Sequence, residues 1–206
     1  MPSSRKPRGP YRKGLERREQ ILRAALEVFA EHGDRGSSLK EIADRVEMSQ
    51  AGVLHYFGSR EELLLAVLEA RDALDTASVG DIHSPGEGMT RTVAHNAQQP
   101  GLVSLFVTLS SAATDPAHPA HAFFAHRYDD LARTLTEGLT TGRDQGVVRS
   151  DISPEKLARL LLAVSDGLQL QWLMNPDVDM TDLVETFNLM CRPPDGTTDG
   201  QAPAAP

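Results

Sequence analysis

The chain has 206 residues, of which 40% are hydrophobic and 24% charged, an ordinary composition for a globular protein. No apolar run approaches the roughly 20 residues of a membrane-spanning helix, and no apolar stretch precedes residue 21, which argues against a signal peptide. Cys191 is the single cysteine, which excludes an intrachain disulfide. We therefore expect a cytoplasmic protein.

The net charge of −8 is divided unevenly, with +4 on residues 1–60 and −12 on residues 61–206. A DNA-packaging protein would need positive charge over much of its surface, so only the N-terminal part favours nucleic acid. Its first residues are rich in basic side chains: Arg5, Lys6, Arg8, Arg12, Lys13, Arg17 and Arg18. Pro7, Gly9 and Pro10 discourage regular structure, which predicts a flexible basic arm over residues 1–13 that follows phosphates or enters a minor groove. The alternative is a solubilising tail.

Three helices are predicted between the arm and residue 58. The first has one apolar face, formed by Ile21, Ala25, Val28 and Phe29. A capping box of Ser38 and Glu41 starts the second, whose apolar stripe is Leu39, Ile42, Ala43 and Val46. Glu47 follows in the turn, where a left-handed conformation would cost a non-glycine residue about 1–2 kcal/mol. Ser49 is the predicted N-cap of the third helix.

The third helix directs Val53 and Leu54 inward and leaves an outward set: Gln50, Ala51, Gly52, His55 and Tyr56. Gln50 can bond bidentately to adenine, Ala51 can touch a thymine methyl, and Gly52 allows close approach of the backbone. Two short helices around a tight turn therefore suit the DNA major groove. The same pair also occurs in plain helical bundles, and His55 or Tyr56 could pack at the helix end instead.

The sequence around this pair is more specific. ERREQILRAALEVFAEHG precedes it and HYFGSREELLLAVLEA follows, so that the segment from Leu15 to Ala70 resembles the DNA-binding domain of TetR/AcrR-type bacterial transcriptional regulators. The resemblance implies a helix-turn-helix head over residues 14–58 that binds double-stranded operator DNA. It implies phosphate contacts from Ser38, Ser49, Tyr56 and Arg60, with Lys40 near the backbone. Gln50, Ala51 and His55 are then our candidates for sequence selection.

The remaining sequence predicts helices only. Ser59 and Glu62 form a second capping box, which begins a connecting helix over residues 59–79. Beyond a break rich in glycine and proline, apolar patterns predict three helices, at Val93, over 102–109 and over 123–139. Ser153 and Pro154 begin another helix that ends at Asn175-Pro176, and Asp179 caps the last, which ends before a disordered tail over 192–206. The predicted fold is all-α, with the three-helix head followed by a helical bundle.

The last two helices are apolar over wide faces, which favours a homodimer. The segment Asp166–Leu173 resembles the C-terminal part of BetI-like members of the family, and the family resemblance implies dimerisation through these two helices on a near-palindromic operator. It also implies an effector-binding and dimerisation domain over residues 80–191, whose small-molecule effector releases the protein from DNA. Residues that interrupt the apolar faces could line the pocket or form plain core: His95, Phe106, Phe123, His126, Gln169 and Trp172.

The alternative is an enzyme or metal-binding protein in which the helix pair is purely structural. His118 and His121, with His126 and Asp129 or Asp130, could suggest a metal cluster, but Pro116 and Pro119 place the first two in or beside a loop. The sequence has no phosphate-binding glycine loop, zinc-protease helix, serine elbow or paired cysteines. We expect a DNA-binding regulator, a repressor by family habit, with no enzymatic activity, cofactor or metal.

Overall fold

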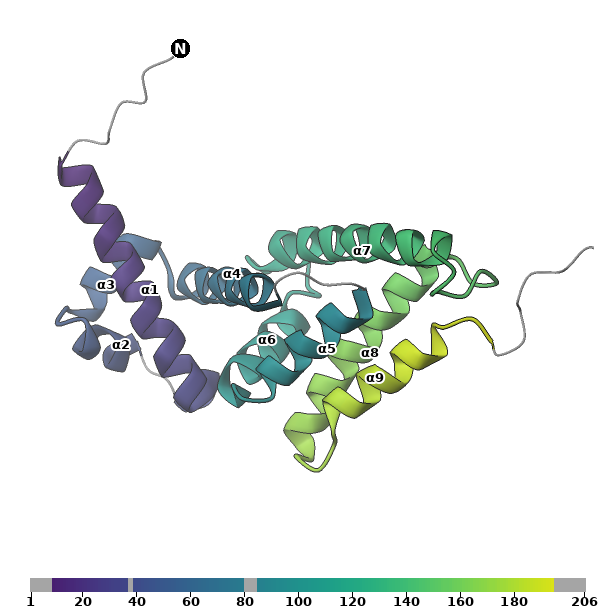
Figure 1. Cartoon of the computed structure of the whole chain (residues 1–206). Coiled ribbons are helices and arrows are strands. Elements are labelled where there is room, and N and C mark those ends of the chain that lie inside the picture. Colours follow the sequence, from purple (N-terminus) through teal and green to yellow (C-terminus); the bar gives the residue numbers. More distant parts are fainter. Residues whose placement is uncertain (1–8, 37–38, 80–84, 195–206) are drawn as a thin grey trace, which may run out of the picture. The chain divides into compact units, whose positions relative to one another are not determined.

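The computed structural model describes residues 9–36, 39–79 and 85–194 (Figure 1). These residues form helices and no strand, which confirms the predicted all-α class. In chain order the helices are α1 (Gly9–Gly36), α2 (Leu39–Arg45), α3 (Gln50–Phe57), α4 (Arg60–Val79), α5 (Pro85–Asn96), α6 (Pro100–Ala112), α7 (His121–Asp144), α8 (Pro154–Met174) and α9 (Met180–Met190).

The chain divides into two compact units. Unit 1 comprises Met1–Ser78 and His95–Ala125, and unit 2 comprises Val79–Ala94 and His126–Pro206. This division differs from a single domain over residues 80–191, because α6 packs against α1 and so belongs to the same unit as the predicted head. The sequence pattern shows that α6 is apolar on most sides, but it does not show which helix covers it.

Unit 1 is built on the predicted apolar faces of the first three helices. The buried side chains are those the periodicity indicated: Ile21, Ala25, Val28, Phe29, Ile42, Ala43, Val46 and Val53. Leu39 and Leu54 are half-buried. Helix α1 already begins at Gly9, so the predicted arm over residues 1–13 is too long; Pro10 is compatible with the first helical turn, where its missing N–H would have no partner. Residues 1–8 of the predicted arm, and Ser38, lie outside the described residues.

In the turn between α2 and α3, Glu47 adopts the left-handed conformation that was considered for this position. Glu47 has a φ of 53° and is the non-glycine residue with a positive φ among the described residues. Its N–H donates to the Asp44 carbonyl at 3.2 Å, and the Met48 N–H donates to the Ala43 carbonyl at 2.8 Å. These two bonds form a Schellman motif, which ends α2 and sets the direction of α3 at the cost of a strained glutamate.

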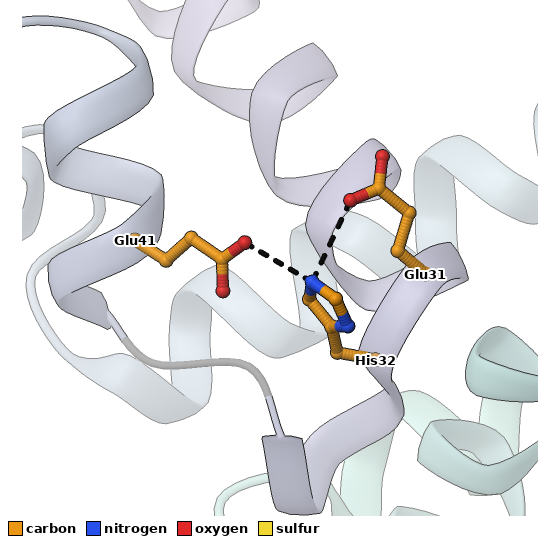
Figure 2. Close-up of side chains that lie close together, drawn as sticks. All are labelled: Glu31, His32 and Glu41. Carbon is orange, nitrogen blue, oxygen red and sulfur yellow. Dashed lines mark ion pairs between the residues drawn. The ribbon is translucent and has the colours of Figure 1, made fainter.

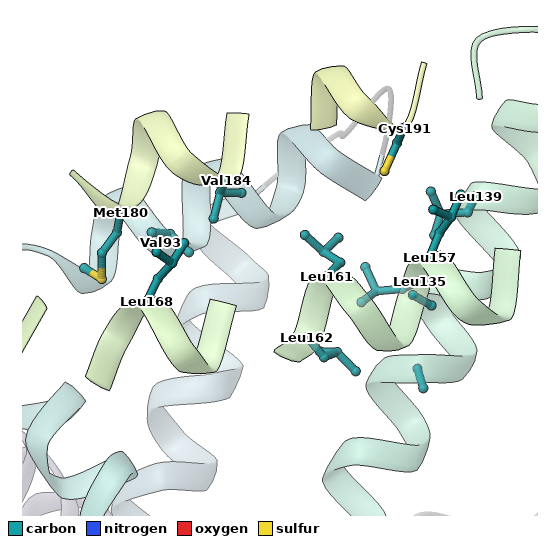
Figure 3. Packing of buried hydrophobic residues seen from close by; sticks show 12 residues of the cluster. Val93, Leu135, Leu139, Leu157, Leu161, Leu162, Leu168, Met180, Val184 and Cys191 are labelled. Atoms are coloured by element: carbon teal, nitrogen blue, oxygen red, sulfur yellow. The ribbon is translucent and has the colours of Figure 1, made fainter. Parts of the chain in front are cut away.

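Unit 2 has its own hydrophobic core, which Figure 3 shows from close by. Side chains from α5, α7, α8 and α9 form it: Val93, Ala132, Leu135, Leu139, Leu157, Ala158, Leu161, Leu162, Leu168, Met180 and Val184, with Cys191. Pro154 occupies the first turn of α8 as predicted, and the Asp179 carboxylate caps α9 by accepting from the Thr181 and Asp182 N–H groups, both at 3.0 Å. Leu160, Leu183 and Met190, which belong to the wide apolar faces of α8 and α9, are 50%, 41% and 64% exposed in the single chain.

Candidate nucleic-acid interface

Helix α3 is fixed at both ends by local hydrogen bonds. The Ser49 hydroxyl accepts from the Gly52 N–H at 3.0 Å, as the predicted N-cap should. At the other end Gly58, with a φ of 81°, donates its N–H to the Leu54 carbonyl at 2.7 Å. The left-handed conformation at this position suits glycine. Val53 and Phe57 anchor the helix in the core, so its outward face has a defined orientation.

The outward face of α3 contains the predicted base-reading set. Gln50, Ala51 and His55 are exposed, and Gly52 and Tyr56 are half-buried. A Cβ added at Gly52 would lie 3.1 Å from Met48 Cε and 3.2 Å from Ser49 Oγ, so a side chain there would crowd the cap. The His55 and Tyr56 rings meet edge-to-face, with centroids 5.8 Å apart. The structure thus brings these five residues onto one short helix.

Tyr56 also lines an open hollow of about 480 Å³ in unit 1. The other lining residues come from α1, the end of α3 and α4: Arg18, Phe57, Gly58, Glu62, Leu65, Ala66 and Glu69. The Ser59 hydroxyl accepts from the Glu62 N–H at 3.1 Å, which confirms the serine half of the second predicted capping box. Arg60, a predicted phosphate contact, is half-buried in the first turn of α4.

Two arginines that the sequence grouped with the basic arm have intramolecular partners. Arg17 Nη2 donates to the Val46 carbonyl at 2.6 Å, next to the turn that joins α2 and α3. The Arg18 guanidinium lies 4.5 Å from the centre of the Phe57 ring, a cation–π contact. Both arginines therefore tie α1 to the helix pair. Sequence spacing could not identify these partners, because Arg17 and Val46 are 29 residues apart.

The charged side chains of α2 are also paired. Lys40 Nζ donates to the Asp44 carboxylate at 2.7 Å, and this hydrogen bond raises the pKa of Lys40 above its usual value. Arg45 reaches across to α1, where its guanidinium lies 2.5 Å from Glu31 Oε2 and 3.4 Å from Glu27 Oε2. The hydrogen bond from Arg45 lowers the pKa of Glu31. Arg45 thus links α2 to α1, whereas Lys40 and Asp44 pair within α2.

The predicted effector residues do not form one cluster within either unit. In unit 1, His95 Nε2 lies 2.8 Å from Gln99 Nε2, and the Phe106 and Phe123 rings both contact Phe124. In unit 2, His126 is exposed and Trp172 packs against the hydrophobic core. Gln169 is buried, and its Nε2 donates weakly to the Ser165 carbonyl at 3.4 Å.

The histidines considered for a metal cluster have structural roles. His118 Nδ1 accepts from the Ala120 N–H at 3.2 Å, and His121 Nδ1 lies 2.8 Å from the Ala113 carbonyl. These bonds close the loop between α6 and α7, in agreement with the position that the two prolines indicated.

Two family models match the chain. Residues 21–67 match the model of bacterial regulatory proteins of the tetR family, and residues 90–187 match the C-terminal model of BetI-type transcriptional repressors. The HTH-type transcriptional repressor AcnR of Corynebacterium glutamicum is 30% identical over 155 residues, which cover 73% of this chain and 78% of that protein. The protein belongs to the TetR family. It is a DNA-binding transcriptional regulator, as the residues of α2 and α3 predicted.

Other family members share this likeness over most of their length. The AcnR repressor of Corynebacterium diphtheriae is 29% identical over 177 residues, covering 82% of this chain and 90% of that protein. A TetR transcription regulator from Haloarcula marismortui has the same fold, with a TM-score of 0.71 at 22% identity over 86% of this chain and 96% of that one. Among the described residues of the regulator, no helix is long and apolar enough to cross a membrane.

Proposed function

We propose that α3 enters the major groove of a near-palindromic operator and that the protein acts there as a repressor. The observation that carries this proposal is the outward face of α3, where Gln50, Ala51 and His55 are exposed on a helix capped at both ends. A fixed helix that presents an amide, a methyl group and an imidazole has the chemistry needed to read base edges. Repression as the sign of regulation follows the BetI-type repressor match and the AcnR relatives.

Phosphate contacts hold the reading helix in register in this proposal. Tyr56 and Arg60 lie at the end of α3 and the start of α4, while Ser49 and Lys40 lie on the other side of the pair. With Ser38, whose position lies outside the described residues, Ser49, Tyr56 and Arg60 are the four proposed phosphate contacts of each subunit, and Lys40 lies near the DNA backbone. With about eight phosphate contacts in a dimer, the slope of log affinity against log salt would be roughly −7.

A homodimer through α8 and α9 supplies the second reading helix. Several large apolar side chains of these helices are exposed in the single chain: Leu160, Leu170, Met174, Leu183, Leu189 and Met190. Exposed apolar side chains concentrated on two adjacent helices are typical of a surface that a partner covers. Leu183→Glu should therefore shift the sedimentation coefficient from that of a dimer toward that of a monomer, whereas Leu74→Glu, a change at an exposed leucine of α4, should leave a dimer.

An effector that binds the bundle would release the regulator from DNA, provided that it has unequal affinity for the two states. The candidate lining residues are the same six: His95, Phe106, Phe123, His126, Gln169 and Trp172. Their types do not select one chemical class of effector.

The decisive experiment is an anisotropy titration of the full chain against DNA from the region upstream of its own gene, with excess nonspecific competitor and several salt concentrations. Gln50→Ala should weaken binding by at least roughly 30-fold, because a dimer loses two bidentate contacts of about 1–3 kcal/mol each. Tyr56→Phe, which keeps the ring and removes the hydroxyl, should weaken binding to all sequences alike.

Gln145→Ala is the matched control, since Gln145 is an exposed glutamine of unit 2. It should bind as the wild type does. Competitor-resistant binding that Gln50→Ala leaves unchanged would show that α3 does not read the bases. Binding that competitor removes from the wild type and every variant alike would contradict specific recognition of that DNA.

A further inference from the structure

Three side chains of types that commonly bind metals meet between α1 and α2. Figure 2 shows Glu31 and His32 on α1 and Glu41 on α2, with the imidazole between the two carboxylates. His32 Nε2 lies 3.2 Å from Glu41 Oε1 and 3.6 Å from Glu31 Oε2. The three candidate ligand atoms all lie within 4.8 Å of one another.

These distances match the spacing of ligands around one small ion. Zinc bonds to imidazole nitrogen and carboxylate oxygen of about 2.0–2.2 Å place neighbouring ligands of a tetrahedral site about 3.3–3.6 Å apart. Both His32 contacts fall near that range, and Glu31 and Glu41 are long side chains that can adjust the third separation. One imidazole and two carboxylates, with an open fourth position for water, form a donor set for divalent first-row transition metals.

The Arg45 guanidinium lies beside the carboxylates of both Glu31 and Glu41. Its Nη2 is 2.5 Å from Glu31 Oε2 and 3.7 Å from Glu41 Oε1. A carboxylate has about four lone-pair positions, so it can accept from a guanidinium and bind an ion at once. A donor in this position orients the carboxylates, as outer hydrogen bonds to metal ligands commonly do. Glu27 also contacts Arg45, at 3.4 Å, but it is not one of the three ligands.

We propose that Glu31, His32 and Glu41 bind a divalent transition-metal ion such as Zn²⁺ that links α1 to α2. Arg45 already links α2 to Glu31 of α1, and a shared ion would add a further connection between the same two helices. Because an ion that binds only the folded arrangement stabilises it by mass action, the ion would raise the thermal stability of the protein. Ion binding at this site can be measured without DNA.

The test is isothermal titration of the tag-free, chelator-treated full chain with Zn²⁺, accompanied by thermal unfolding with and without the ion. The wild type should bind one ion per chain at saturation and show a higher unfolding midpoint in zinc. His32→Gln and Glu41→Gln should each weaken that binding by about tenfold or more and remove the zinc-dependent shift in midpoint.

Two control variants separate this site from other surface groups. Glu27→Gln removes a carboxylate that contacts Arg45 but is not a ligand, and His126→Gln removes an exposed histidine of unit 2. Both should bind zinc as the wild type does. The proposal is overturned if the wild type shows no saturable binding, in which case the cluster is an ion-pair network with Arg45. It is equally overturned if His32→Gln and Glu41→Gln bind as the wild type does, which would show adventitious binding elsewhere.

Discussion

Helices α2 and α3 are neighbours of 7 and 8 residues that use their polar side chains in opposite ways. In α2, Lys40 pairs with Asp44, and Arg45 and Glu41 reach the side chains of α1. In α3, the side chains of Gln50 and His55 form no hydrogen bond within the described parts of the chain and remain exposed. Ion pairs thus link α2 to α1, whereas the polar side chains of Gln50 and His55 on α3 are exposed, as the proposed contact with DNA requires. The difference teaches that α3, the proposed reading helix, is held by its caps and by the buried Val53 and Phe57, and not by ion pairs of its exposed face.

The largest expected change in stability comes from truncating Ile42, the buried anchor of α2. Ile42 is 1% exposed, so Ile42→Ala should lower the free energy of unfolding by about 2–5 kcal/mol through lost burial and a residual cavity. Gln50→Ala in α3 should change it by no more than about 0.5 kcal/mol, because Gln50 is exposed. Chemical denaturation of both variants measures the two values. A Gln50→Ala variant as unstable as Ile42→Ala would show that α3 also serves the fold.

A smaller effect is expected where the two helices join. Glu47→Gly should raise the free energy of unfolding by up to about 1 kcal/mol, because glycine adopts the observed positive φ without the side-chain clash. Glu47→Ala is the control, since it removes the carboxylate and keeps the clash. The denaturation midpoints of the wild type, Glu47→Gly and Glu47→Ala measure this difference in stability. A gain in Glu47→Ala equal to that in Glu47→Gly would assign the effect to charge and not to backbone conformation.

The smallest effect concerns the ion pairs of α2. The hydrogen bond from Arg45 lowers the pKa of Glu31 in the folded protein from its usual 4.5. A group with a lowered folded pKa stabilises the protein above its unfolded pKa, and this contribution is lost as the pH falls through the folded value. The wild type should therefore have a higher thermal midpoint than Glu31→Gln at pH 7, and the difference should shrink below about pH 4.5. A difference that does not depend on pH would contradict a role for the charge of Glu31.

Prediction from sequence succeeded where one short segment holds all the information. The apolar spacing of Ile42, Ala43 and Val46 determines the buried face of α2, and Ser49 and Asp179 cap the helices that directly follow them. The exposed set on α3 follows from the same periodicity, and the surrounding motifs identify the family. Glu47 could be recognised as a strained position because the need for a left-handed residue arises from the local turn.

Only the tertiary structure decided which distant residues meet. Arg17 and Arg18 belong in the sequence to a run of basic residues, and in the fold they contact Val46 and Phe57. The packing of α6 against α1, and the meeting of Glu31 and His32 with Glu41, likewise join segments that share no local pattern. Local hydrogen bonds and side-chain periodicity depend on residues within a few positions of one another, so the sequence by itself determined the helices, their caps and the exposed face of α3. Contacts between helices depend on how whole surfaces pack together, and for that reason these pairings became visible only in the folded chain.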